Sequence, residues 1–145
     1  MATMQDILSR KGRQVHAVAP EAMVLQAAEL MSQHGIGAVL VQSDRRLLGV
    51  FTERDVLRRV VGERRDPAKT AVSEVMTSEV VCGQLETSIE EARTVMRNRR
   101  IRHLPILAEK GELLGLVSIG DLNAWELDGH EKTIRYLHDY IYGRA

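Results

Sequence analysis

The 145-residue chain is poor in cysteine, in aromatic residues and in net charge. Cys82 is its only cysteine, so an intramolecular disulfide is impossible and the cysteine-rich zinc frameworks are excluded. The 20 Lys and Arg residues balance the 20 Asp and Glu residues, which excludes a strongly basic nucleic-acid arm and an acidic tail. Because aromatic residues make up only 3% of the chain, few rings could stack on bases, and we do not expect a nucleic-acid partner.

Long apolar runs are missing as well. No stretch approaches the roughly 18 uncharged apolar residues that a membrane span needs. The opening MATMQDILSR also lacks the apolar centre of a secretory signal. Together with the single cysteine, these features predict a cytoplasmic protein without membrane association. The composition, 44% hydrophobic and 28% charged residues, is that of a folded globular domain.

An internal repeat organises the chain. Four apolar residues of the first half recur at an offset of 65 residues: Val24, Ala27, Met31 and Ile36 match Ile89, Ala92, Met96 and Ile101. After a polar turn the offset becomes 66: Leu48, Gly49, Thr52 and Asp55 match Leu114, Gly115, Ser118 and Asp121. The repeat predicts two similar units, residues 8–62 and 73–127, joined by a solvated linker over residues 63–72.

Each half has the pattern helix, strand, strand, helix. Apolar residues at helical spacing predict helices over about 22–34 and 89–99. Gly35 is suited to end the first helix, and Ser88 with Glu91 forms a capping box at the start of the second. Apolar runs predict strand pairs, 36–41 with 47–51 and 103–107 with 113–117. A short helix should follow each pair, and the first of these should stop at Gly62.

The predicted architecture is a single α+β unit. A hairpin with one or two helices is too small to bury its own apolar face, so the two halves should pack together around a pseudo-twofold axis. Residues 128–145 predict a further helix, which could cover the core or meet a partner. One face of that helix is apolar and carries Ile134, Leu137, Tyr140 and Ile141.

Enzyme signatures are not supported. The run GIGAVL over residues 35–40 has Leu40 where a dinucleotide fingerprint needs its third glycine, and it leads into a strand. The run GLVSIG over residues 115–120 is one residue too long for a nucleophile elbow around Ser118. The five histidines show no metal-ligand spacing. We therefore expect neither a catalytic residue, nor a catalytic cofactor, nor a metal site.

The strongest signal is the duplicated turn from strand to helix, in which a hydroxyl residue precedes an aspartate by three positions. Thr52 with Asp55, and Ser118 with Asp121, are good capping pairs, because the hydroxyl accepts from a first-turn N–H and the acid complements the helix dipole. The same geometry can bind a ligand, since free N–H groups bind anions and a carboxylate accepts from the hydroxyls of a ribose. Capping and binding are compatible.

This twofold pattern, with HLP in a strand and then G-h-h-[ST]-x-x-D-h, where h is hydrophobic, resembles the cystathionine-β-synthase (CBS) domain. Two such domains in tandem are similar to a Bateman module, and the resemblance covers residues 8–127. It implies two clefts between the repeats that bind adenine nucleotides. By the same resemblance, Asp55 and Asp121 bind the ribose, one in each cleft, with the hydroxyls of Thr52 and Ser118 beside the ribose or phosphate.

The resemblance also implies phosphate contacts that differ between the clefts. Arg54 lies between hydroxyl and acid in the first copy, where its guanidinium can pair with a phosphate, and Gly120 lies there in the second. Arg102 and His103 in the second half stand where similar proteins contact phosphate. The first half has Gly37 at the matching position. The two clefts should therefore differ in their affinity for anions.

The adenine, by the same resemblance, should lie between Ile36 and Ile101, with backbone near His16 and Val81 at its edge. The resemblance implies a non-catalytic regulatory module that binds AMP, ADP, ATP or NAD(H) and senses energy or redox state. It also implies a homodimer and an unidentified regulated protein on another chain. The alternative is a module for protein interaction or dimerisation, in which the clefts are vestigial and the capping pairs serve stability.

Overall fold

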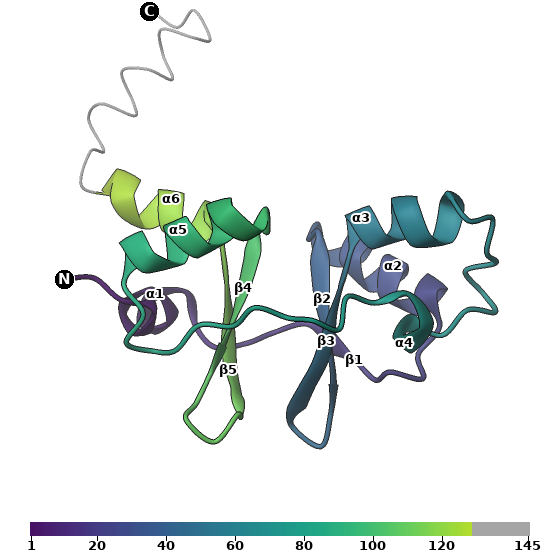
Figure 1. Cartoon of the computed structure of the whole chain (residues 1–145), viewed down its shortest axis with the longest axis horizontal. Coiled ribbons are helices and arrows are strands. Elements are labelled where there is room, and N and C mark those ends of the chain that lie inside the picture. Colours follow the sequence, from purple (N-terminus) through teal and green to yellow (C-terminus); the bar gives the residue numbers. More distant parts are fainter. Residues whose placement is uncertain (129–145) are drawn as a thin grey trace, which may run out of the picture.

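The computed structural model describes residues 1–128, so the helix predicted beyond residue 128 lies outside the described residues. Two sets of strands and helices follow each other along the chain (Figure 1). The first half contains α1 (Met4–Lys11), β1 (Ala17–Val18), α2 (Val24–His34), β2 (Ala38–Ser43), β3 (Arg46–Thr52), α3 (Glu53–Asp55) and the π-helix η1 (Val56–Val61). The second contains α4 (Val72–Val75), α5 (Ile89–Arg99), β4 (His103–Leu107), β5 (Leu113–Ser118) and α6 (Ile119–Asp128).

The helices predicted before each hairpin are confirmed, together with their ends. Gly35 ends α2 in the left-handed conformation, with φ of 62°, which glycine adopts without a steric penalty. At the start of α5, the hydroxyl of Ser88 accepts a hydrogen bond from the backbone N–H of Glu91 at 3.1 Å. Both helices pack one face on a core: Ala27 in α2 and Ala92 in α5, separated by the repeat offset, are fully buried.

The predicted hairpins are confirmed and form two small sheets. Strand β2 pairs antiparallel with β3, and β4 pairs antiparallel with β5. The short strand β1 adds parallel to β2 in the first sheet, with Ala17 opposite Leu40. In the second half a single parallel bridge from Gly83 to Ile106 stands in the same position. The segment that enters each half therefore lies along the edge of its hairpin.

The helix that follows β3 has an unusual hydrogen-bond pattern. After the first turn, α3, it continues as η1, in which N–H groups bond five residues back: Gly62 donates to the carbonyl of Leu57 at 2.8 Å. Short π stretches of this kind occur mostly within α-helices and often near functional sites. The corresponding helix of the second half, α6, is a regular α-helix. The helix ends before Gly62, as the sequence predicts.

Each core is completed by a short helix from elsewhere in the chain: α1 packs in the core of the second half, and α4 packs in the core of the first half. Met4, Ile7 and Leu8 of α1 are buried in the core of the second half, with α5, β4 and β5. Val72 and Val75 of α4 are buried in the core of the first half. Figure 1 shows α1 beside β4 and β5, and α4 beside the first sheet. α4 therefore packs in the first core although it lies at the start of the second half in the sequence.

A glycine in each hairpin permits this close packing. A Cβ at Gly49 in β3 would stand 2.6 Å from the sulfur of Met76 and 2.8 Å from the carbonyl oxygen of Thr77. A Cβ at Gly115 in β5 would stand 2.8 Å from a methyl group of Leu8. Contacts this short do not occur in folded proteins, so glycine lets the residues after α4 and Leu8 of α1 lie against the strands. The requirement is strictest at Gly49, where the neighbour is backbone, and at Gly115 the close atoms belong to the end of a leucine side chain.

A third apolar cluster joins the halves at the seam between the sheets. Ala38, Leu40 and Val50 of the first sheet are buried there. Leu113 and Leu116 of β5 pack against them from the second half. The two sheets therefore share a core, and the chain is an α+β unit of two similar halves, as predicted. Within residues 1–128, no helix has the length and apolarity that crossing a bilayer requires.

Candidate functional site

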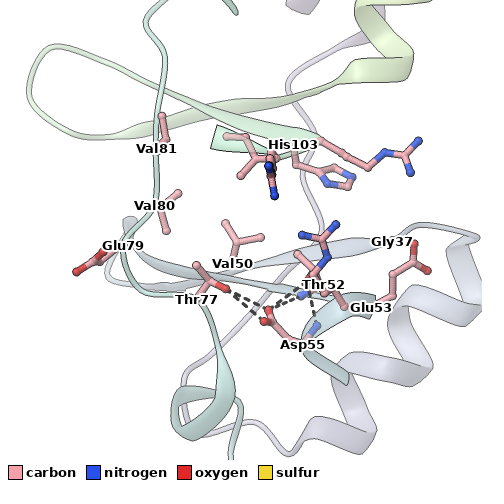
Figure 2. A pocket seen from close by; sticks show the side chains of 14 residues that line it. Gly37, Val50, Thr52, Glu53, Asp55, Thr77, Glu79, Val80, Val81 and His103 are labelled. Carbon is pink, nitrogen blue, oxygen red and sulfur yellow. Dashed lines mark hydrogen bonds between the residues drawn. The ribbon is translucent and has the colours of Figure 1, made fainter. Parts of the chain in front are cut away.

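A cavity of about 250 Å³ lies at the seam, beside the N-terminus of α3 (Figure 2). Both halves contribute to its wall, together with the segment that leads from α4 towards the second half. The lining residues are Gly37, Val50, Thr52, Glu53, Arg54, Asp55, Thr77, Glu79, Val80, Val81, Arg100, Ile101, Arg102 and His103. Eight of the residues named from the sequence are thus brought together: Gly37, Thr52, Arg54, Asp55, Val81, Ile101, Arg102 and His103.

Asp55 forms one end of the cavity and is 5% exposed. Its Oδ2 accepts hydrogen bonds from the backbone N–H of Thr52 at 3.0 Å and from the Thr52 hydroxyl at 3.2 Å. In return, the N–H of Asp55 donates to the Thr52 hydroxyl at 3.2 Å. The predicted capping arrangement is therefore present. A further hydroxyl, that of Thr77, reaches the two carboxylate oxygens at 3.3 and 3.4 Å.

The hydroxyl contacts to Asp55 are long. Hydrogen bonds between a hydroxyl and an oxygen usually measure about 2.5–3.0 Å. The Thr52 and Thr77 hydroxyls stand at 3.2–3.4 Å from the carboxylate. Both hydroxyls can also rotate to donate or accept elsewhere. The carboxylate is therefore held in place by the backbone N–H and can exchange its weaker hydroxyl partners for those of a ligand.

Positive charge gathers around the cavity. Arg54 comes from the helix after β3, and Arg100 and Arg102 come from the approach to β4. Guanidinium groups bind phosphate through two parallel hydrogen bonds. Glu53 and Glu79 also line the wall, so the cavity carries both signs of charge. Apolar side chains also line the cavity, among them Val80 and Val81 (Figure 2).

His103 stands in the cavity wall on β4 as a neutral imidazole at neutral pH. Burial lowers its pKa below the ordinary value, and the positive charge of Arg102 lowers the pKa further. The carboxylate of Glu53 opposes this, Lys11 lowers the pKa again, and Asp121 raises it. Together these effects keep the ring neutral in the free protein. A bound anion beside the ring would stabilise the protonated form and so raise the pKa of His103.

Asp121, the counterpart of Asp55, has different neighbours. Its Oδ2 accepts from the backbone N–H of Ser118 at 2.8 Å, and its own N–H donates to the Ser118 hydroxyl at 3.1 Å, so the cap is repeated. Lys11, the last residue of α1, places its ammonium 2.6 Å from the same carboxylate oxygen. Burial raises the pKa of Asp121, but hydrogen bonds from Lys11 and Ser118 outweigh it and lower the pKa overall.

Five of the residues named from the sequence do not line the cavity: His16, Ile36, Ser118, Gly120 and Asp121. Ile36 packs against the core of the first half. The ring of His16 stacks on that of His34 with the centroids 4.1 Å apart. Ile36 and His16 are the repeat counterparts of Ile101 and Val81, and of these four residues Ile101 and Val81 line the cavity.

Sequence reasoning missed the residues contributed by the segments before each hairpin. Thr77, Glu79 and Val80 line the cavity, and Lys11 binds Asp121, yet none was proposed as a site residue. The repeat does not mark this pair, because the offset before the polar turn is 65 residues whereas Lys11 and Thr77 are 66 residues apart.

The comparisons with known proteins agree with this geometry. Residues 3–62 and residues 72–127 each match the family model of the CBS domain. The chain belongs to the CBS-domain family. The CBS domain-containing protein YhcV of Bacillus subtilis is 38% identical over 122 residues, covering 84% of this chain and 84% of that protein.

Two solved structures show the same CBS-domain pair. A protein with CBS domains from Burkholderia ambifaria is 38% identical, with a TM-score of 0.84, over 88% of this chain and 95% of the other. A CBS domain protein from Pyrobaculum aerophilum in complex with AMP is 24% identical, with a TM-score of 0.74, over 82% of this chain and 88% of the other. The likeness to the second protein shows that the CBS-domain fold is shared.

The remaining reactive side chains of this CBS-domain pair do not gather into a second centre in residues 1–128. No group of three or more His, Cys, Asp or Glu side chains is positioned there to hold a metal ion. Cys82 is partly buried, and burial raises the pKa of its thiol, which disfavours the nucleophilic thiolate. The seam cavity is therefore the candidate functional site.

Proposed function

We propose that the chain is a non-catalytic regulatory module that binds an adenine nucleotide in the cavity beside Asp55. The observation that carries this proposal is the set of groups that line one cavity: a buried carboxylate, apolar side chains and guanidinium groups. That set matches a ribose, an aromatic base and a phosphate. The AMP complex of the Pyrobaculum relative supports the class of ligand.

Each residue has a role in this proposal. Asp55 accepts from the ribose hydroxyls, and Thr52 and Thr77 exchange their long contacts with Asp55 for contacts with the sugar. Arg54 and Arg102 pair with the phosphate. The base lies against the apolar residues that line the cavity between these groups: Val50, Val80, Val81 and Ile101.

Regulation follows from the position of the cavity at the seam. A ligand there touches residues of both halves, so it favours whichever relative arrangement binds it more tightly. The resulting change in surface is read by a separate protein, and the module thereby reports the energy or redox state of the cell through AMP, ADP, ATP or NAD(H). A cytoplasmic location, predicted from the composition, is consistent with access to these ligands.

Thermal unfolding with AMP, ATP, NADH and adenosine tests the proposal. A ligand that binds only the folded protein raises its stability by about 2.7 kcal/mol at 100 times the dissociation constant. We expect AMP or NADH to raise the melting temperature, and Asp55→Asn to remove the gain. Asp6→Asn is the matched control, because Asp6 caps α1 through the N–H of Thr3 at 2.9 Å, away from the cavity. Equal stabilisation of Asp55→Asn and the wild type would refute the proposal.

A second candidate function, homodimerisation, is favoured by one surface feature. Leu57 and Val61 of η1 are 64% and 63% exposed and lie four residues apart on the helix. Large apolar side chains gathered at the surface mark interaction sites. We propose that they contact a second copy of the chain. Light scattering should give twice the mass of one chain for the wild type and a single mass for Leu57→Asp, whereas a single mass for the wild type would contradict the dimer.

A further inference from the structure

The two copies of the motif differ in what reaches the acid from outside the motif. In the first half, the hydroxyl of Thr77 reaches Asp55 at 3.3 Å. In the second half, the ammonium of Lys11 reaches Asp121 at 2.6 Å. Lys11 is the last residue of α1, and Thr77 lies two residues after α4, the helix that completes the other core. By its contact with the acid, Lys11 therefore stands in the place of Thr77.

A second contact supports this correspondence. The N–H of Thr77 donates to the carbonyl of Val50, which is two residues before Thr52 in β3. In the second half the carbonyl of Leu116, two residues before Ser118 in β5, accepts at 2.8 Å from the ammonium of Lys11. One lysine side chain thus makes both contacts that Thr77 makes with its backbone and its hydroxyl.

The distances and charges separate the two acids chemically. The contacts of hydroxyls with Asp55 are long and neutral, and the guanidinium of Arg59 stands beyond hydrogen-bond distance, with its Nε 3.7 Å from Oδ1. The contact of Lys11 with Asp121 is short and charge-assisted, a class of hydrogen bond about twice as strong as a neutral one. A sugar hydroxyl can replace a threonine hydroxyl with little loss, but it must break an ion pair to reach Asp121.

Lys11 extends from a packed helix, with its side chain 35% exposed. It ends α1, whose Ile7 and Leu8 are buried in the core of the second half. The N–H of Gly12 closes the helix by donating to the carbonyl of Leu8 at 2.8 Å. The lysine therefore starts from a rigid element, and its ammonium has both of its contacts within the same half.

The structure assigns Lys11 as a built-in occupant of the second cleft, which blocks nucleosides from Asp121 and limits the chain to one nucleotide, held beside Asp55. This inference rests on the proposed function for the class of ligand. It adds a specificity-determining residue outside the repeated motif, and it makes the stoichiometry a property of one side chain.

Calorimetric titration with AMP tests the assignment in the wild type and in Lys11→Thr, which copies Thr77 into the second half. We expect one site per chain in the wild type and two in the variant, with the affinity of the new site within about tenfold of the first. The double variant Lys11→Thr, Asp121→Asn should return to one site. Arg13→Thr is the matched control, because it removes an exposed cation two residues away and should leave one site.

Folding of the variants is checked through the fluorescence of Trp125, which packs against the second core beneath the guanidinium of Arg10. Lys11→Met, which keeps most of the side-chain length without the charge, provides a second variant if Lys11→Thr is unstable. It too should gain a site.

The outcomes separate this inference from the proposed function. Equal numbers of sites in the wild type and both variants overturn the assignment, as does a variant with weaker binding and no new site, which would make Lys11 a ligand-binding cation. If the wild type binds no AMP but Lys11→Thr gains one site, the assignment stands and the proposed function beside Asp55 fails. If neither binds AMP, both fail.

Discussion

The acids Asp55 and Asp121 come from two copies of one motif and perform the same local task. Each accepts from the N–H of the hydroxyl residue three positions earlier, and each caps the following helix. Their third neighbours differ, because Thr77 approaches one and Lys11 the other. The comparison teaches that the motif determines the cap, while a residue from the preceding segment determines whether the carboxylate is available to a ligand. The predictions below test this comparison.

The largest difference should appear in stability. Asp55→Ala removes a carboxylate that is 5% exposed together with its bond from the part-buried N–H of Thr52, and the loss of such a buried hydrogen-bonded group costs about 1–3 kcal/mol. Asp121→Ala removes a half-buried cap and an ion pair, for which we expect about 1 kcal/mol. Urea denaturation of both variants measures the free energies of unfolding. A larger loss for Asp121→Ala would reverse the proposed ranking of the two acids.

A second difference should appear in the pH dependence of AMP binding. The pKa of His103 is lowered in the free protein by burial and by Arg102, and a phosphate in the cavity would raise it again. Binding should therefore take up a proton at the ring, and affinity should increase about three- to tenfold as the pH falls from 8 to 6.

His103→Gln is the control for this pH effect, because the phosphate of AMP itself titrates near pH 6 and does so equally for both proteins. The ratio of the two affinities, measured by calorimetry at each pH, isolates the imidazole. A ratio that stays constant from pH 8 to pH 6 would show that His103 does not face the phosphate.

The smallest effect concerns the ion pair of the second half. The pKa of Asp121 is lower in the folded protein than the ordinary value, so its contribution to stability is present above about pH 3.9 and is lost as the pH falls through its folded pKa. Lys11→Met should therefore destabilise the protein by about 0.2–1 kcal/mol at pH 7. The difference from the wild type should shrink towards pH 3 in urea titrations, and a difference that grew on acidification would contradict it.

Local signals in the sequence predicted the hairpins and the longer helices well. The caps at Gly35 and Ser88, the alternation with polar turns and the repeat itself are all encoded within a few residues. The short elements α1, β1 and α4 were not predicted, because two to eight residues carry little periodicity. The positions of α1 and α4 in the fold depend on tertiary packing, because Gly49 and Gly115 leave space for neighbouring residues beside the strands.

The candidate site was predicted in part for the same reason. Residues within the motif or in the strand HLP, such as Asp55 and His103, were found because the repeat marks them. Thr77 and Lys11 were missed because they lie outside the motif, in segments whose place depends on the crosswise packing of α4 and α1. Ile36 was assigned to the same site as Ile101, although the repeat relates them as counterparts on opposite sides of the seam.

The crosswise packing of α1 has a consequence during synthesis on the ribosome. The buried residues of the first core all lie within residues 24–75, so this core can form before the rest of the second half is made, while the seam residues Ala38, Leu40 and Val50 still lack their partners from β5. The apolar face of α1 finds its partners only after Leu122 has been added. At a synthesis rate of about 5–20 residues per second, the side chains of Met4, Ile7 and Leu8 have no core to pack against for roughly 5 to 25 s. During that interval the apolar face of α1 is exposed and can bind chaperones or neighbouring polypeptides.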